Sequence, residues 1–378
     1  MNIGKKRILY IGGFQLPDKN AAAHRVLGVG KSLRDIGYIV EFLDVSDNIE
    51  DDDLSAKWCC QGFSVYSQRH SRNNRQRIQY TCKPLHVEEI LDKHNDWNAV
   101  IAYNYPALAL LKLRKICHKR GIRIFSDCTE WYAFDGKTIS DILTFVDSEI
   151  RMRFVHKKLD GLIAISSFLG DYYQKHLPTI VVPPTVDLDE KKWHQDMPLK
   201  NNGLIVLTYA GTIGNSRNKD QISIVIHTII ECGLSIRLNI VGVTEDAYLN
   251  LYPEDTDLLK EYTVRNRIIF HGRLHHEEAL KILQGSDYCI FYRENTRLNR
   301  AGFPTKFVES ISCGVPVITT RTSDLAQYIN NRGFLLEQDQ FLTQFAACIT
   351  QTIALSDKDR QLFSYINFTD RIELLFRE

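Results

Sequence analysis

Short apolar runs alternate with longer amphipathic stretches along this chain. The runs have the length of buried strands, and between them apolar residues recur every three or four positions, as on one face of a helix. Residues 21–36 show this spacing with Val26, Val29, Leu33 and Ile36. In the first half, strands are predicted over residues 7–11, 38–43, 99–103, 122–126, 162–165 and 180–182, and helices over 21–36, 106–120 and 139–159. This alternation favours a parallel sheet covered by helices on both faces.

A polar stretch after Pro183 and Pro184 is the best candidate for a linker. Beyond it the alternation resumes, with strands predicted over 204–209, 236–241, 268–271, 288–291 and 315–319 and a helix over 219–232. We predict an α/β fold with two Rossmann-like doubly wound domains, residues 1–185 and 186–360, and a cleft between them. Ligands of such sheets bind at the carboxyl ends of the strands. Residues 361–378 are expected to form a C-terminal helix that returns to the first domain.

The most informative motif lies within residues 302–320, where Pro304 fits the first turn of a helix and Gly314 fits its end. A helix N-terminus exposes unpaired N–H groups and a partial positive charge, which suits a phosphate. Lys306 adds a full charge there, and Glu309 follows on the same helical face, where its carboxylate could accept hydrogen bonds from sugar hydroxyls. A diphosphate with a ribose attached would satisfy both side chains. The alternative is an ordinary surface Lys–Glu pair on an amphipathic helix.

Further loops carry glycines or cations just past predicted strand ends. In a doubly wound sheet these loops share one edge, so their cations would converge on one anionic ligand. The residues predicted to bind it are Arg217, Lys219, Arg273, Thr305, Lys306 and Glu309. Loops predicted to approach a phosphate or sugar contain Gly12, Gly13, Gly302, Phe303 and Pro304. Each arginine taken alone has a structural role as its alternative.

Charge and cysteine usage narrow the class of protein. The net charge of +1 is uneven, because residues 1–185 hold 26 Lys/Arg against 21 Asp/Glu and residues 186–378 hold 21 against 25. Basic clusters at 69–77 and 151–158 could touch an anionic membrane or acceptor, or be solvated surface. Nine cysteines without a Cys-x-x-Cys motif indicate reduced thiols, and no apolar run reaches 18 residues. We expect a cytoplasmic protein, at most peripheral at the inner membrane face, with no nucleic-acid partner.

Several apparent motifs carry no function. The run Asp51-Asp52-Asp53 contains the Asp-x-Asp spacing of some metal-dependent transferases, but no apolar strand precedes it. The glycines at Gly12 and Gly13 do not continue into Gly-x-Gly-x-x-Gly, which argues against a nicotinamide dehydrogenase. We therefore expect neither a metal nor a cofactor.

Taken together, these motifs resemble those of the retaining GT-B glycosyltransferases of family 4 (glycosyl transferases group 1). The resemblance covers the Ala-Gly-Thr loop at 210–212, the run 270–273 and the run 302–320, and extends to residues 8–14 and the first helix with Ala22, His24 and Arg25. It implies a nucleotide-diphosphate sugar, a UDP- or GDP-sugar, bound as substrate mainly by the second domain. A saccharide or lipid-linked acceptor would bind mainly to the first. The resemblance also implies that Glu309 binds the donor ribose, and that Lys306 and the cation of the glycine loop contact the diphosphate.

Two positions depart from the family pattern, Ala301 where a glutamate is common and Thr129 where a histidine is common. Around the second of these, Asp127 and Glu130 are the candidates for positioning the acceptor, and His24 could contact the acceptor or the diphosphate. The alternatives are a helix cap or a pair with Arg123 for the two acids, and a partly buried helix histidine for His24.

The resemblance implies transfer of a sugar with retention, in the synthesis of a surface polysaccharide. One alternative is a GT-B sugar-nucleotide epimerase or hydrolase, which turns over the donor without an acceptor. The other is a non-catalytic partner that binds the nucleotide sugar, and Ala301 and Thr129 are the features that favour it.

Overall fold

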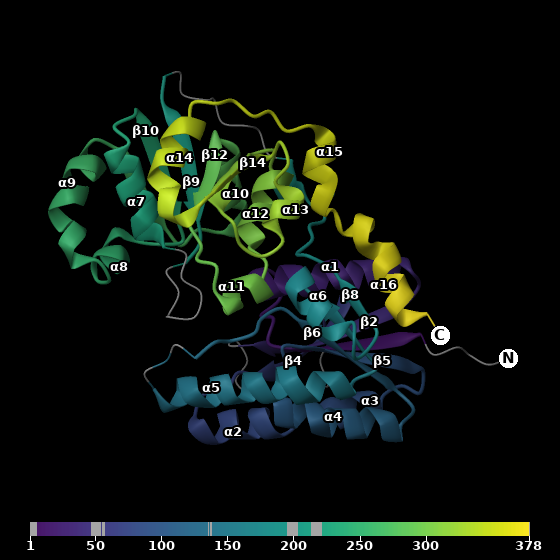
Figure 1. Ribbon diagram of the computed structural model, residues 1–378. Coiled ribbons are helices and arrows are strands. Elements are labelled where there is room, and N and C mark those ends of the chain that lie inside the picture. The colour runs from purple at the N-terminus through teal and green to yellow at the C-terminus, as the bar shows by residue number, and fades with distance from the viewer. Residues whose placement is uncertain are drawn as a thin grey trace. The chain divides into compact units, whose positions relative to one another are not determined.

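Two separate sheets with helices on their faces organise this protein (Figure 1). The structure is a computed structural model that describes residues 6–46, 54, 57–134, 136, 138–194, 203–212 and 221–377. The chain divides into two compact units. Unit 1 contains residues 1–185, 301–303 and 365–378, and unit 2 contains residues 186–300 and 304–364.

Unit 1 is built on an eight-stranded sheet with the order β3-β4-β2-β1-β5-β6-β7-β8. Its strands are β1 (Arg7–Gly12), β2 (Ile39–Ser46), β3 (Trp58–Cys60), β4 (Phe63–Arg69), β5 (Trp97–Tyr103), β6 (Arg123–Cys128), β7 (Gly161–Ala164) and β8 (Thr179–Val181). All neighbours pair in parallel except β3 and β4, which form an antiparallel pair at the edge. The hairpin was not predicted, because the short strand β3 is mostly exposed and polar residues interrupt the apolar positions of β4.

Helices cover both faces of this sheet (Figure 1). One face carries α1 (Ala21–Asp35), α6 (Ser167–Tyr173) and the C-terminal α16 (Thr369–Phe376), and the other carries α2 (Asn74–Cys82), α3 (Val87–Leu91), α4 (Ala107–Lys119) and α5 (Ile139–Ile150). The side chain of Asn20 caps α1 by accepting hydrogen bonds from the N–H groups of Ala22 and Ala23. Phe376 of α16 packs on Phe125 of β6, with ring centroids 4.5 Å apart.

The predicted helix over residues 139–159 is interrupted. After α5 the backbone continues as one π-helical turn, Arg151–Val155, and then as a 3-10 turn, His156–Lys158. Such a π-turn shifts the helical register by about one residue, which apolar spacing alone does not reveal.

Unit 2 is built on a six-stranded parallel sheet with the order β11-β10-β9-β12-β13-β14. Its strands are β9 (Ile205–Ala210), β10 (Ile236–Val241), β11 (Ile268–Gly272), β12 (Tyr288–Phe291), β13 (Val317–Thr320) and β14 (Gly333–Leu336). Its helices are α7 (Ile222–Glu231), α8 (Glu245–Leu249), α9 (Thr256–Val264), α10 (His276–Gln284), α11 (Arg297–Ala301), α12 (Thr305–Ser312), α13 (Leu325–Tyr328), α14 (Phe341–Cys348) and α15 (Asp357–Arg360). The last residue of α11, Ala301, belongs to unit 1.

The core of unit 1 contains an aromatic cluster beneath α1. Tyr10 and Phe42 lie with their ring centroids 5.6 Å apart, and Phe63 packs edge-on against Phe42 at 5.3 Å. Val26, Val29 and Leu33 of α1 complete this core, as the sequence spacing predicts, and each is at most 1% exposed.

Within the described residues, no helix is both long and apolar enough to cross a bilayer.

Candidate active site

Lys306 lies in the first turn of α12, and its ammonium group reaches the ends of two strands of unit 2. The side chain is buried, with Nζ 4.4 Å from the ring centroid of Tyr209 in β9 and 5.3 Å from that of Phe291 in β12. A Cβ atom built on Gly211 would lie only 2.7 Å from this Nζ atom. The aromatic faces hold the ammonium by cation–π attraction. Its charge therefore sits at the carboxyl end of the sheet, against the glycine loop.

A second glycine brings the backbone of this loop close to the neighbouring strand. Gly242 follows β10, and a Cβ atom there would lie 2.4 Å from the carbonyl oxygen of Gly211. Its φ of +94° is also one that side chains rarely adopt. Gly242 therefore requires glycine, whereas a side chain at Gly211 would displace the lysine ammonium. The strand ends of β9 and β10 thus present bare backbone beside the ammonium of Lys306.

The predicted donor-binding residues fall at several places in unit 2. Thr305 is the first residue of α12, and Pro304 precedes it without a side-chain cap. Arg273 follows β11 and is exposed, and in the sheet β11 is separated from β9 by β10. Arg217 and Lys219 lie outside the described residues. The structure therefore brings together Lys306 and the start of the glycine loop, while Arg273 lies further along the same edge.

Glu309 has a partner that the sequence analysis did not identify. Its Oε1 atom lies 3.2 Å from Nε2 of His276, the first residue of α10. Both side chains are partly exposed, at 21% for Glu309 and 14% for His276, and the indole of Trp193 packs edge-on against the imidazole. Thus Glu309 lies one helical turn beyond Lys306, with an imidazole beside its carboxylate. Because His275 and His276 are adjacent in the sequence, only the fold shows which of them reaches Glu309.

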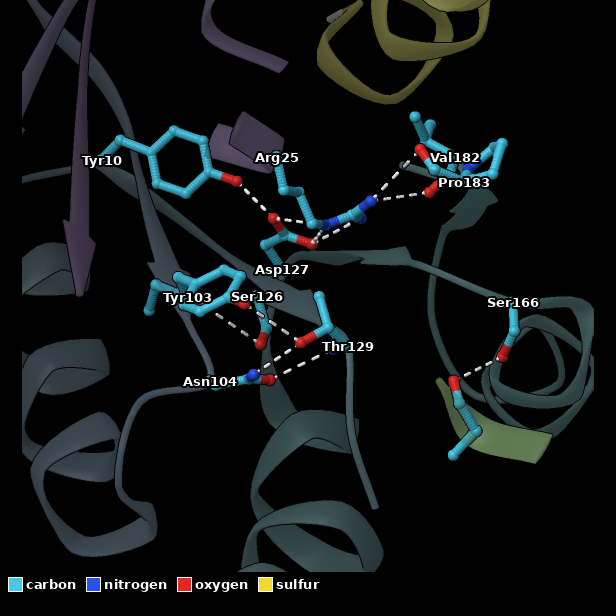
Figure 2. Close-up of polar contacts among 12 residues, drawn as sticks. Tyr10, Arg25, Tyr103, Asn104, Ser126, Asp127, Thr129, Ser166, Val182 and Pro183 are labelled. Carbon is cyan, nitrogen blue, oxygen red and sulfur yellow. Dashed lines mark hydrogen bonds and ion pairs between the residues drawn. The ribbon is translucent and has the colours of Figure 1, made fainter. Parts of the chain in front are cut away.

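Gly302 and Phe303 belong to unit 1, although Pro304 belongs to unit 2. Ala301, which replaces the common glutamate, is fully buried, and its carbonyl oxygen accepts a hydrogen bond of 2.7 Å from Oγ of Ser166 (Figure 2). No carboxylate is therefore present at this position of α11.

In unit 1, the predicted glycine loop follows β1. Gly12 is buried, and a Cβ atom there would lie 3.1 Å from the carbonyl oxygen of Tyr103, whereas Gly13 is exposed. The loop is held by Asp44 at the end of β2, whose carboxylate accepts the N–H groups of Phe14, Gln15 and Leu16 at 2.7–2.9 Å. Burial raises the pKa of Asp44, and these hydrogen bonds oppose that shift. Sequence spacing gave no signal for this anchor.

His24 lies in the second turn of α1, where its Nε2 atom pairs with the carboxylate of Asp18. Its side chain is partly exposed, at 19%. It is thus a partly accessible imidazole near the loop after β1. This position is compatible with contact to the acceptor or the diphosphate, and also with a partly buried helix histidine that has no such contact.

Asp127 lies at the end of β6, in a buried cluster that Figure 2 shows. Arg25 donates to both of its oxygens at 2.6–3.0 Å, and Tyr10 donates its hydroxyl to Oδ2. The Arg25 Nη1 atom also donates to the carbonyl oxygen of Val182 at 2.8 Å. Burial, followed by the charge of Asp127, holds the pKa of Tyr10 well above its usual range, so this phenol stays protonated.

The burial and the hydrogen bonds of Asp127 decide whether its carboxylate can reach an acceptor. The side chain has no exposed surface, and both oxygens are occupied. A structural role therefore fits the geometry better than contact with an acceptor. The structural partner is Arg25, 102 residues earlier, and not Arg123, which donates to Asn98.

Glu130 and Thr129 follow β6 at the same edge of the sheet. Glu130 is partly exposed and accepts a hydrogen bond from the hydroxyl of Tyr132. Thr129 is buried, accepts from Nδ2 of Asn104 at 2.6 Å, and donates its N–H to Oδ1 of Asn104 at 3.1 Å (Figure 2). At the position where a histidine is common, the protein thus has the hydroxyl of Thr129, which the amide of Asn104 holds in place. Of the two predicted carboxylates, Glu130 is more accessible than Asp127.

Comparison with known proteins adds a family model that matches part of the chain, and a fold. Residues 205–354 match the family model described as Glycosyl transferases group 1. This region contains Lys306, Glu309 and the described start of the glycine loop. No curated protein matches the sequence.

Solved structures resemble the chain over nearly its whole length. A sucrose-phosphate synthase from Thermosynechococcus elongatus aligns with a TM-score of 0.72 at 14% identity, over 98% of each chain. The catalytic domain of starch synthase IV from Arabidopsis thaliana, bound to ADP and acarbose, gives 0.67 at 11% identity over 99% of each chain. HepE from Anabaena, in complex with UDP and glucose, gives 0.64 at 13% identity over 98% of each chain.

These likenesses show the fold. The chain has the GT-B fold of two Rossmann-like domains, which confirms the predicted fold class. Together with the family model, they support a glycosyltransferase of the GT-B fold. Membership of family 4, retention and the individual site residues stay predictions.

Proposed function

We propose that this protein transfers a sugar from a nucleotide-diphosphate sugar to an acceptor hydroxyl, with retention of configuration. The observation that carries the proposal is the position of Lys306, whose ammonium lies against Gly211 at the carboxyl end of the unit 2 sheet. It belongs to the region that matches the group 1 glycosyltransferase model. A cation at a strand end, beside bare glycine backbone and a helix N-terminus, is suited to a diphosphate.

Glu309 supports a nucleoside diphosphate over a simple phosphate. It lies one turn further along α12, and its carboxylate is partly exposed beside His276. A carboxylate can accept hydrogen bonds from the two vicinal hydroxyls of a ribose, and a simple phosphate offers no such pair of hydroxyls. Among the similar structures, HepE was solved with UDP and starch synthase IV with ADP, which supports a nucleotide ligand for this chain.

The proposed reaction needs charge stabilisation more than side-chain chemistry. The bond between the anomeric carbon and the β-phosphate oxygen breaks, and the acceptor oxygen forms a bond to that carbon on the same face. The acceptor proton passes to an oxygen of the donor phosphate. Lys306, Arg273 and the N–H groups at the start of α12 stabilise the charge that develops on the leaving diphosphate. Glu130 is the carboxylate that we assign to orienting a saccharide or lipid-linked acceptor.

A non-catalytic nucleotide-sugar-binding protein is the second candidate. It is favoured by Ala301, which is fully buried, and by Thr129, whose hydroxyl is held by Asn104. Neither side chain can supply a carboxylate or an imidazole to a transferred sugar.

Turnover distinguishes the two candidates. The wild type is incubated with UDP- and GDP-sugars, with and without simple saccharide acceptors, and the released nucleotide and the product anomer are measured. We expect slow hydrolysis of one donor, faster release with an acceptor, and a product with the anomeric configuration of the donor. The variant Lys306→Ala should lose about 1.5–3 kcal/mol of donor binding, because a charge-assisted contact to phosphate is removed.

Nucleotide binding without any turnover would support the non-catalytic candidate. A product of inverted configuration would reject retention while keeping transfer. Unchanged binding and turnover in Lys306→Ala would reject the site itself.

A further inference from the structure

The outward face of α5 and of the π-turn after it is apolar. Exposed side chains occur here at the spacing of one helical face, and they are Ile139, Ile142, Leu143, Val146, Ile150 and Phe154. Three of them are more than three-fifths exposed, at 77% for Ile139, 64% for Leu143 and 62% for Phe154. Single exposed apolar residues are common on protein surfaces, but a contiguous stripe marks an interaction site.

The polar residues of the same helix face inward or are used within the fold. Ser148 is fully buried, and Asp147 accepts the N–H of Ala107 at 2.9 Å. Glu149 accepts the indole N–H of Trp131 at 2.9 Å. In a normal surface helix the apolar face packs on the core. In α5 the apolar stripe faces away from the sheet instead.

The neighbouring helix α2 carries positive charge beside this stripe. Nη2 of Arg77 in α2 donates to Oγ of Ser140 in α5 at 3.0 Å, and Figure 1 shows both helices on the same face of the unit 1 sheet. Arg72, at the approach to α2, and Arg75 are exposed, and residues 57–87 contain six Lys/Arg and no Asp or Glu. Beyond α5, Arg153 and Lys158 are also exposed, and Arg153 pairs with Glu149.

We propose that this face of unit 1 binds an anionic lipid bilayer. A stripe of long aliphatic and aromatic side chains, flanked by cations without nearby acids in α2, complements acyl chains below anionic headgroups. The helix α5 lies parallel to the membrane plane, with Leu143 and Phe154 inserted and the arginines of α2 at the headgroups. This proposal is independent of the proposed transfer reaction.

Vesicle co-sedimentation tests the docking surface directly. The full chain is mixed with vesicles of phosphatidylcholine alone or of phosphatidylcholine with phosphatidylglycerol. We expect strong binding to the anionic vesicles, weakened by added salt. The double variant Leu143→Asp/Phe154→Asp should lower the partition coefficient by about tenfold or more, because two apolar anchors become charged. Arg72→Gln/Arg75→Gln should weaken binding to anionic vesicles only.

The matched control is Leu374→Asp on α16, a 61% exposed leucine outside the stripe that receives the same charge. It should bind vesicles like the wild type. All variants are checked for an unchanged circular dichroism spectrum, and the single variant Phe154→Asp replaces the double variant if the latter fails to fold.

Three results would overturn the proposal. The first is an absence of wild-type binding to the anionic vesicles, and the second is an equal loss of binding in Leu374→Asp and the stripe variant. The third is a dimer in light scattering that the stripe variant dissociates while vesicles are not bound, which would make a second copy the occupant. Nucleotide-induced stabilisation should be the same in all variants, so this test is separate from the proposed function.

Discussion

Lys306 and Gly211 approach so closely that a β-carbon on the glycine would lie 2.7 Å from the lysine Nζ atom. The two residues come from different elements, since Gly211 follows β9 and Lys306 lies in the first turn of α12. The absence of a side chain at Gly211 thus leaves room for the ammonium, which lies over the ring of Tyr209 at the carboxyl end of the sheet. This relationship defines the phosphate end of the proposed donor site.

The first prediction concerns this pair. Gly211→Ala should displace the ammonium of Lys306 and weaken nucleoside diphosphate binding by about tenfold, since one charge-assisted contact is misplaced. Binding is measured by isothermal titration calorimetry. In the background Lys306→Ala, the same glycine substitution should cost much less, because no ammonium remains to be displaced. Additive losses in the double variant would show that Gly211 acts independently of Lys306.

The second prediction concerns Glu309 and His276, which lie 3.2 Å apart. Glu309→Gln should weaken binding of a ribonucleoside diphosphate by about tenfold or more, because the hydrogen bonds of a charged acceptor are lost. His276→Ala should do the same more mildly, since the imidazole only positions the carboxylate. The control ligand is the 2′,3′-dideoxy nucleotide, which should bind the wild type and both variants equally. A loss that is as large for the dideoxy ligand would place Glu309 away from the ribose.

The third prediction concerns Asp127, which we assign a structural role. Asp127→Asn should lower the free energy of unfolding by about 3–5 kcal/mol, because it leaves the buried guanidinium of Arg25 without its counter-charge. Urea unfolding measures this loss. The double variant Arg25→Met/Asp127→Leu should recover part of it, since no buried charge then remains unpaired. A variant Asp127→Asn of normal stability that binds donor but fails to transfer would instead support the role of Asp127 in positioning the acceptor.

The fourth prediction concerns pH. His156 is buried between Ser126 and Tyr173, and burial, followed by the charge of Arg151, holds the pKa of its imidazole well below the usual range. The unfolded chain binds a proton at this residue below about pH 6.5, and the folded chain does not. The free energy of unfolding should therefore fall as the pH drops below that value, by up to about 1.4 kcal/mol per pH unit, with no contribution above it.

Urea unfolding at several pH values between neutral and mildly acidic checks this effect. His156→Gln should remove that part of the pH dependence, whereas the exposed His176→Gln should leave it in place. An unchanged pH dependence in His156→Gln would show that other groups are responsible.

The sequence predicted the two parallel sheets well, because apolar spacing and glycine helix stops are local signals. Five of the six strands described in unit 2, and the helix that starts at Thr305, lie within a residue or two of their predicted positions, whereas β14 was not predicted. The same local signals placed Lys306 and Glu309 together in this helix, and their roles in binding stay predictions.

What the sequence did not reveal depends on contacts between distant residues. The pairing of Asp127 with Arg25 joins positions 102 residues apart, and the anchoring of the loop after β1 by Asp44 spans 28–30 residues. His276 and Glu309 are 33 residues apart on different helices. The edge hairpin of β3 and β4 was missed for another reason, because neither strand has the continuous apolar run by which buried strands are recognised: β3 is mostly exposed, and polar residues interrupt β4.

The proposed function requires that unit 2 binds a nucleoside diphosphate through Lys306 and Glu309. Calorimetric titration of UDP, GDP, ADP and CMP into the wild type and into Lys306→Ala measures this binding. We predict that one diphosphate binds the wild type, that its affinity falls at least tenfold in Lys306→Ala, and that the monophosphate CMP binds weakly to both. Equal binding of that diphosphate to the wild type and the variant, or no binding of any nucleotide to the wild type, would rule out this donor site.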